Sequence, residues 1–255
     1  MKQTKEIIEC LEAARNEEQR CILMRFFKTG PGEYGEGDEF LGLKVPQTRE
    51  IARAAMDVPV GEVPELLMSR WHEVRLCGLM IMVAKFEKLT TKRNIREAGA
   101  TAKRDEILTI YLRYARRVNN WDLVDLSAPK ILGHWLLLPT ALGNGRNEYK
   151  LHVVDKLARS SNLWEQRMSM VCTWKTLQQG DPSWCLRYAE MHLHHSHDLM
   201  HKAVGWMLRE MGKRCSMELL REFLRHHAKE MPRTMLRYAI EKMSERERKQ
   251  WMARP

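Results

Sequence analysis

The sequence predicts an all-α protein that is built from repeated pairs of helices. Apolar residues recur near the helical period along most of the 255-residue chain, beginning with residues 3–28. The one clear interruption is a glycine-rich loop at residues 29–39. Beyond residue 62, similar segments return at intervals of roughly 30–47 residues, which is the spacing of two-helix repeats.

Each repeated segment ends one helix, turns at a polar position and starts a second helix with a basic residue near its front. The segments span residues 67–79, 158–170, 195–206 and 227–239, with a looser one at 116–125. A two-helix unit cannot bury its apolar face alone, so stacked units form a HEAT-like or armadillo-type solenoid, an α-α superhelix with a concave surface. We therefore expect residues 1–255 to form a single α-helical repeat domain.

The charge composition favours a polyanionic partner, because 43 Lys and Arg residues outnumber 33 Asp and Glu residues and give a net charge of +10. The basic residues near the fronts of the second helices are Arg75, Arg167, Lys202 and Arg233 or Arg237. Each of them has a plainer interpretation, in which it solvates a helix start or pairs with a neighbouring Glu. Their recurrence in register favours a basic groove that follows DNA phosphates.

Several function classes are disfavoured. The six cysteines show no zinc-ligand spacing and no apolar stretch has membrane-spanning length, so we expect reduced thiols in a cytoplasmic protein. The histidines of residues 192–201 lack a His-Glu-x-x-His motif, and Asp198 among them is interpreted as a helix N-cap. The glycine-rich loop lacks the ending of a phosphate-binding loop, and its acidic residues, including Asp38, would repel phosphate. We expect no metal and no cofactor.

The segment of residues 119–125 is the strongest candidate for chemistry. A helix that starts near Asn120 places Trp121 and Asp125 four residues apart on one face. Asp122 then points elsewhere and either caps the helix or complements its N-terminal dipole. Taken alone, the segment is more simply explained by a core tryptophan and a solvated carboxylate.

Two later pairs of tryptophan and basic residues favour a functional interpretation of this segment over the structural one. Trp164 precedes Arg167 by three residues and Trp206 follows Lys202 by four, so each pair shares a helix face. Aromatic faces beside cationic side chains suit a groove that contacts bases and backbone together.

The sequence resembles the AlkD-like DNA alkylation repair proteins, a family of HEAT-like-repeat DNA glycosylases, from about residue 20 to residue 240. The blocks that carry the resemblance are EFLGLKVP (39–46), VNNWDLVD (118–125), SNLWEQR (161–167), KAVGWMLRE (202–210) and TMLRYA (234–239). Two features depart from the family pattern. Phe26 stands where the family often has a tyrosine, and the loop at residues 29–39 is longer than in the shortest members.

The resemblance implies a glycosylase that removes N3- and N7-alkylated purines from duplex DNA without flipping the base. It implies that Trp121, Asp125 and Arg167 are catalytic and that Trp206 is a second aromatic wall. It further implies four residues that contact the DNA backbone, namely Arg49, Lys202, Arg209 and Arg237.

These residue types suit that reaction. An N3- or N7-alkylated purine is cationic and already a good leaving group, so the enzyme needs to stabilise the sugar as it becomes oxocarbenium-like. Asp125 can supply the negative charge and orient water, Trp121 and Trp206 can offer π faces to the cation, and Arg167 can hold a phosphate.

Two alternatives come from other classes. A non-catalytic HEAT-like module that binds distorted or branched DNA would share the fold, but it has no need of Trp121, Asp125 and Arg167 together. A protein-binding scaffold predicts an apolar or acidic concave face, against which the net charge of +10 argues. We expect a monomer in the cytoplasm that associates with the nucleoid when it binds duplex DNA, with no membrane and no obligate protein partner.

Overall fold

A computed structural model describes residues 1 and 3–253 of the chain, and these form helices, turns and one isolated β-bridge between Glu39 and Trp71. The all-α prediction is confirmed. The chain divides into two compact units, Met1–Ile131 with Pro139–Asn144 and Leu132–Leu138 with Gly145–Pro255. The single domain expected over residues 1–255 and its concave basic groove both concern the two units together, and they stay predictions.

The helices of the first unit are α1 Thr4–Ala13, α2 Glu17–Phe26, α3 Val45–Ala54, α4 Val63–Leu67, α5 His72–Lys88, α6 Ala100–Arg113 and α7 Trp121–Ser127. Those of the second unit are α8 His134–Leu136, α9 Asn147–Ala158, α10 Leu163–Val171, α11 Trp174–Leu177, α12 Ser183–Met191, α13 Asp198–Arg214, α14 Met217–His227, α15 Arg233–Ala239 and α16 Glu245–Met252. Short 3-10 turns span Val60–Glu62, Ala115–Arg117 and Leu142–Gly145, and a π-helical turn spans Pro129–Gly133. Among the described residues, no helix has the length and apolar character needed to cross a membrane.

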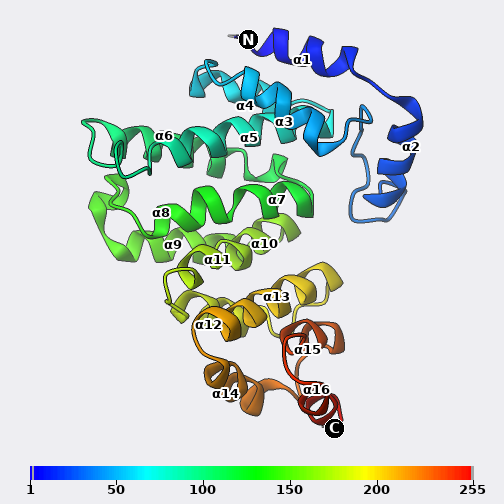
Figure 1. The fold of residues 1–255 in the computed structure, drawn as a ribbon, viewed down its shortest axis with the longest axis vertical. Helices are drawn as coiled ribbons and strands as arrows, with labels where there is room; N and C mark the ends of the chain where they lie inside the picture. Colours follow the sequence, from blue (N-terminus) through cyan, green and yellow to red (C-terminus); the bar gives the residue numbers. More distant parts are fainter. Residues whose placement is uncertain (2, 254–255) are drawn as a thin grey trace. The chain divides into compact units, whose positions relative to one another are not determined.

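Helix α5 is the buried centre of the first unit. Every residue from His72 to Val83 is buried, and α3, α4 and α7 all pack against this helix (Figure 1). A helix that is buried on all sides must satisfy its polar side chains internally, because water does not reach them. The polar residues at the front of α5 do so by binding the loop before α3 and the start of α7.

The expected helical stretch of residues 3–28 is two helices, α1 and α2, rather than one. The first helix ends at Ala13, and Asn16 starts the second: its backbone is extended, and its side chain accepts a hydrogen bond from the backbone N–H of Gln19, 2.8 Å away. Ile7 and Leu11 of α1 are buried, whereas no residue within α2 is. The apolar spacing of α2 therefore does not reflect a core-facing stripe.

Glu73 of α5 fixes the chain that leads into α3. Its carboxylate accepts the backbone N–H groups of Leu41, Gly42 and Leu43 at 2.9, 2.8 and 3.1 Å. Gly42 has φ +92°, and a Cβ there would lie 2.0 Å from the carbonyl oxygen of Asn16. Only glycine lets this segment approach the start of α2 so closely.

The second unit is organised around α13, on which α10, α12 and α15 pack (Figure 1). Gly205 lets α15 approach α13, because a Cβ at this position would lie 2.4 Å from the carbonyl oxygen of Met235 and 2.5 Å from the Cβ of Tyr238. Asp155 ties α9 to α12 through Arg187 Nη2 and the hydroxyl of Tyr188, at 2.7 and 2.9 Å.

The repeated segments of the sequence coincide with helix pairs in the structure. The second helices of the five segments begin at Trp121 for the looser segment, and at His72, Leu163, Asp198 and Arg233 for the others. Within the units, α4 packs on α5, α9 on α10 and α12 on α13. The prediction of a helical-repeat fold is confirmed.

Replacing Gly205 with alanine tests the close packing of α13 on α15. We expect the free energy of unfolding to fall by about 1–3 kcal/mol, because backbone and Cβ atoms of α15 would have to move away. Urea unfolding of the purified variant measures the effect. Gly61→Ala is the matched control, since a Cβ there meets nothing within 4 Å; an equally small effect in both variants would contradict the assignment.

Candidate functional site

The two predicted catalytic residues of the first unit lie on α7. Asn120 caps this helix, and its side chain accepts the backbone N–H of Trp121 at 2.8 Å. Trp121 is the first residue of α7 and Asp125 the fifth, so they occupy one face of successive turns, as predicted. Both side chains are half-buried.

Trp121 lies in a cluster of aromatic rings. Its indole stacks on Phe27 with 5.4 Å between ring centroids, and Phe26 meets it edge-on at 6.0 Å. Phe27 in turn stacks on Phe40 at 5.1 Å. Phe27 and Phe40 are buried, whereas Phe26 is 60% exposed. The aromatic position that the sequence assigns to Phe26 therefore adjoins Trp121, with most of its ring facing solvent.

Asp122 points away from Trp121 and Asp125, toward a buried histidine. His72 of α5 contacts the Asp122 carboxylate through Nε2 at 2.9 Å and the Asp38 carboxylate through Nδ1 at 2.8 Å. Only 2% of the His72 side chain is exposed. Asn120 rather than Asp122 caps α7, but Asp122 lies in the first turn, where its charge complements the helix dipole as the second alternative expected, and it also connects α7 to α5.

Arg75 and Asp38 form a buried ion pair beside this histidine, and both earlier expectations for them are wrong. The Arg75 guanidinium binds the Asp38 carboxylate and the carbonyl oxygens of Ser69 and Arg70, and only 1% of the residue is exposed. Arg75 therefore cannot line a basic groove. Asp38 is likewise buried and paired, so it does not repel phosphate at the surface.

The charges in this cluster stabilise one another. Burial alone would lower the pKa of His72, but Asp122 and Asp38 raise it to about 9, so the imidazole is protonated at neutral pH. Burial alone would raise the pKa of Asp38, but His72 and Arg75 hold it below its ordinary value. His72 is thus an imidazolium between two carboxylates.

The second unit holds Arg167, Lys202, Trp206, Arg209 and Arg237. Arg167 lies on α10 and is buried, with Nη1 donating to the carbonyl oxygen of Leu199 at 2.6 Å in the first turn of α13. Lys202 pairs with Asp198 at 2.7 Å.

Asp198 is the first residue of α13, and the N-cap is His197, whose Nδ1 accepts the N–H of Leu199 at 3.1 Å. The N-cap interpretation of Asp198 is therefore wrong by one residue.

Arg167 and Lys202 act together on the front of α13. Burial lowers the pKa of His197, and the charges of His201, Arg167 and Lys202 lower it further, although Asp198 opposes them. The second unit therefore gathers two of the predicted cations at one helix start.

The remaining predicted residues of the second unit differ in accessibility. Arg209 binds Glu241 and lies 3.7 Å from Glu210, whereas Arg237 on α15 is exposed and Trp206 is half-buried. Trp164 and Arg167 are only 6% and 5% exposed, so the pair predicted on α10 presents little surface to a ligand.

The predicted residues share a register in the helices that carry them. Asp125, Arg167, Lys202 and Arg237 are each the fifth residue of α7, α10, α13 and α15. Arg75 is the fourth residue of α5. One residue rotates a side chain by about 100° around a helix, and this explains why Arg75 lies inside the core. The registers do not place the two units relative to each other, so the assembly of these residues into one site stays a prediction.

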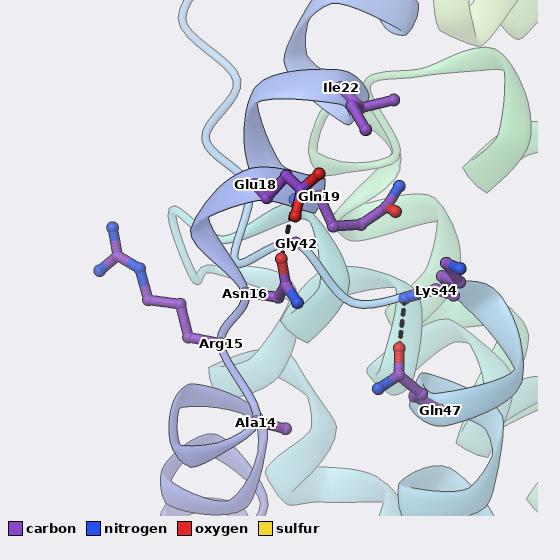
Figure 2. A pocket seen from close by; sticks show the side chains of 9 residues that line it. All are labelled: Ala14, Arg15, Asn16, Glu18, Gln19, Ile22, Gly42, Lys44 and Gln47. Carbon is purple, nitrogen blue, oxygen red and sulfur yellow. Dashed lines mark hydrogen bonds between the residues drawn. The ribbon is translucent and has the colours of Figure 1, made fainter.

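Two hollows in the first unit lie beside other residues. One has a volume of about 570 Å³ and is lined by Arg15, Asn16, Gln19, Ile22, Lys44 and Gln47 among others. Figure 2 shows it between the start of α2 and the start of α3. The other, of about 190 Å³, is lined by Arg49, Arg53 and Lys130 over an apolar floor that includes Met80 and Leu126. Arg49 is exposed here, as its predicted contact with the DNA backbone requires.

Residues 7–243 match the family model of the DNA alkylation repair enzymes. The chain belongs to this family. The structure also resembles a predicted DNA alkylation repair enzyme from Enterococcus faecalis, with a TM-score of 0.64, 12% sequence identity, and coverage of 91% of this chain and 97% of that chain. At this identity the likeness shows the fold alone. No curated protein matches the chain.

Sequence reasoning missed His72 and the structural role of Asp38 in this alkylation repair family member. The partners of His72 lie 34 and 50 residues away along the chain, so no local pattern reveals them. The available signal was a cluster of polar residues, His72, Glu73 and Arg75, at the start of a strongly apolar helix. Such residues need internal partners, and this need identifies them as structural.

The His72 bridge predicts that the folded protein becomes less stable as the pH rises above neutral. The folded-state pKa of about 9 exceeds the ordinary value of 6.5, so the contribution is complete below pH 6.5 and is lost as the pH rises through 9. We expect the free energy of unfolding to fall across this window by on the order of 3 kcal/mol. Urea unfolding at several pH values measures the slope. His72→Gln has no group that titrates there, and a slope as steep as that of the wild type would contradict this origin.

Proposed function

We propose that the protein is a DNA glycosylase of base-excision repair, which hydrolyses the N-glycosidic bond of cationic N3- and N7-alkylated purines in duplex DNA. The observation that carries the proposal is the start of α7. There Trp121 rests on Phe27, and Asp125 follows one turn later on the same face. The neighbouring carboxylate, Asp122, is already bound to His72. An aromatic face and a carboxylate thus lie side by side on a helix turn whose position is fixed by the contacts with Phe27 and His72.

The proposed reaction uses Asp125 as the negative charge. Water adds to C1′ of the deoxyribose as the bond from C1′ to the purine nitrogen breaks, and the electron pair of that bond neutralises the cationic purine, which leaves. The carboxylate of Asp125 stabilises the oxocarbenium-like sugar and accepts the proton of the attacking water. Because the purine is already cationic, no acid is needed to protonate it.

Trp121 and Trp206 supply π faces, and each such contact with a cationic nucleotide contributes about 0.5–2 kcal/mol. They therefore favour the charged lesion over ordinary DNA. We further propose that the lesion stays in the duplex and that the base is not flipped, as the resemblance to the HEAT-like-repeat glycosylases implies.

In this proposal the cations hold the damaged strand. Arg167, although only 5% exposed, contacts a phosphate through its guanidinium, whose orientation is set by the hydrogen bond to the carbonyl of Leu199. Lys202, Arg209, Arg237 and Arg49 contact the backbone around it. The protein acts on duplex DNA as a monomer in the cytoplasm.

Asp125→Asn tests the chemistry, because it keeps the shape of the side chain and removes its charge. We expect base release to fall by on the order of a thousandfold, the effect of losing about 4 kcal/mol of charge stabilisation in the transition state. The assay quantifies free bases released from duplex DNA that carries N7-methylguanine and N3-methyladenine.

Asp57→Asn is the control, since Asp57 is an exposed carboxylate of the same unit, and it is expected to leave release unchanged. Unaltered release by Asp125→Asn would refute the role of Asp125. A wild-type protein that binds DNA in a salt-sensitive manner and releases no base would instead be a non-catalytic DNA-binding module.

A further inference from the structure

We infer that His72 is a positioning residue for base release: held between Asp38 and Asp122, it fixes the first turn of α7 so that Trp121 and Asp125 face the lesion. The inference rests on the proposed function for the reaction itself. The inference goes beyond the proposed function because it assigns a role to a buried group that touches neither DNA nor the reacting atoms. It also makes the site responsive to alkaline pH.

The first connection between His72 and the site runs through Asp122. Asp122 is the second residue of α7, next to Trp121 and one turn before Asp125. Its Oδ2 lies 2.9 Å from Nε2 of His72, and its Oδ1 has no hydrogen-bond partner among the described residues. The backbone of this first turn is thus tied at Asn120, by its own cap, and at Asp122, by His72.

The second connection runs through the aromatic cluster. The imidazole of His72 stacks on Phe40 with 4.4 Å between ring centroids and an interplanar angle of 17°, and it lies 5.1 Å from Phe27. Phe27 carries the indole of Trp121 at 5.4 Å. A cationic ring is attracted to aromatic faces, so the charged form of His72 also favours this stack. The position of Trp121 therefore depends on His72 by two separate routes.

Loss of the proton releases Asp122 rather than Asp38. The charged groups around His72 are Asp38 of the loop, Asp122 of α7 and Arg75 of α5, with Arg117 interacting electrostatically with both Asp38 and Arg75. A neutral imidazole keeps only one N–H, so it donates to one carboxylate and turns a lone pair toward the other. Asp38 retains the Arg75 guanidinium. Asp122 has His72 alone as a hydrogen-bond partner in the part of the chain described, and the start of α7 moves with it.

Asp122→Asn tests this inference, because the amide oxygen still accepts from His72 while the charge that favours the imidazolium is removed. At acidic pH, where His72 carries its proton in the variant as well, we expect base release close to that of the wild type. We expect the alkaline limb of the pH–rate profile to move to lower pH by about one unit or more. Short incubations with no-enzyme controls correct for spontaneous base loss.

The matched control is Asp155→Asn, which removes the carboxylate that Arg187 and Tyr188 bind in the second unit. It is expected to leave the alkaline limb where it is in the wild type. A limb that stays in place in Asp122→Asn, or that moves equally in Asp155→Asn, would overturn the inference. A purely structural contact would lower activity at every pH and leave the profile's shape unchanged.

A second measurement does not depend on activity. In the free protein labelled with ¹⁵N at histidine and tryptophan, the indole N–H resonance of Trp121 should shift in step with deprotonation of the His72 imidazole, and at lower pH in Asp122→Asn. Trp121→Phe assigns the resonance. An indole resonance that stays constant while His72 loses its proton would refute the inference. If the wild type releases no base at any pH, the proposed function fails, and this titration still decides the role of His72.

Discussion

The first unit depends on a protonated imidazole that water does not reach. Placing a charge in the interior carries a desolvation penalty of several kcal/mol, which only close partners of opposite sign can offset. His72 has two such partners on separate segments, the loop before α3 and the start of α7. The bridge is therefore stable only when three distant parts of the chain have their native arrangement, and it favours this arrangement over others of similar compactness.

A second constraint is the register of the repeats. In four of the five second helices, the fifth residue is among those predicted to contact DNA or substrate. It is a carboxylate once, in α7, and a cation in α10, α13 and α15. The same helix position thus carries different chemistry in successive repeats.

Local features of the site followed from the sequence, whereas long-range partners did not. The helix start near Asn120 and the four-residue spacing of Trp121 and Asp125 are properties of one helix turn, and the structure has both. The sequence did not identify Asn120, rather than Asp122, as the capping residue. The burial of Trp164 depends on packing between helices, and its three-residue spacing from Arg167 does not reveal that burial. The exclusion of Arg75 depends on a shift of one residue in the start of α5, which is smaller than the precision of boundary prediction from sequence. The sequence does carry a local signal for the break at Asn16, namely a capping residue followed by two glutamates.

Helix α2 has a consequence for how the family can diversify. None of its residues is buried, yet it ends at Phe26, whose ring adjoins Trp121. The residues that anchor α2 lie outside the helix itself: Asn16 caps its start, and Phe27, just beyond its end, is buried. Exchanges along its solvent side leave the hydrophobic core untouched, so they are nearly neutral for folding. Natural selection can therefore vary this helix, and with it the surroundings of Trp121, without passing through unstable intermediates.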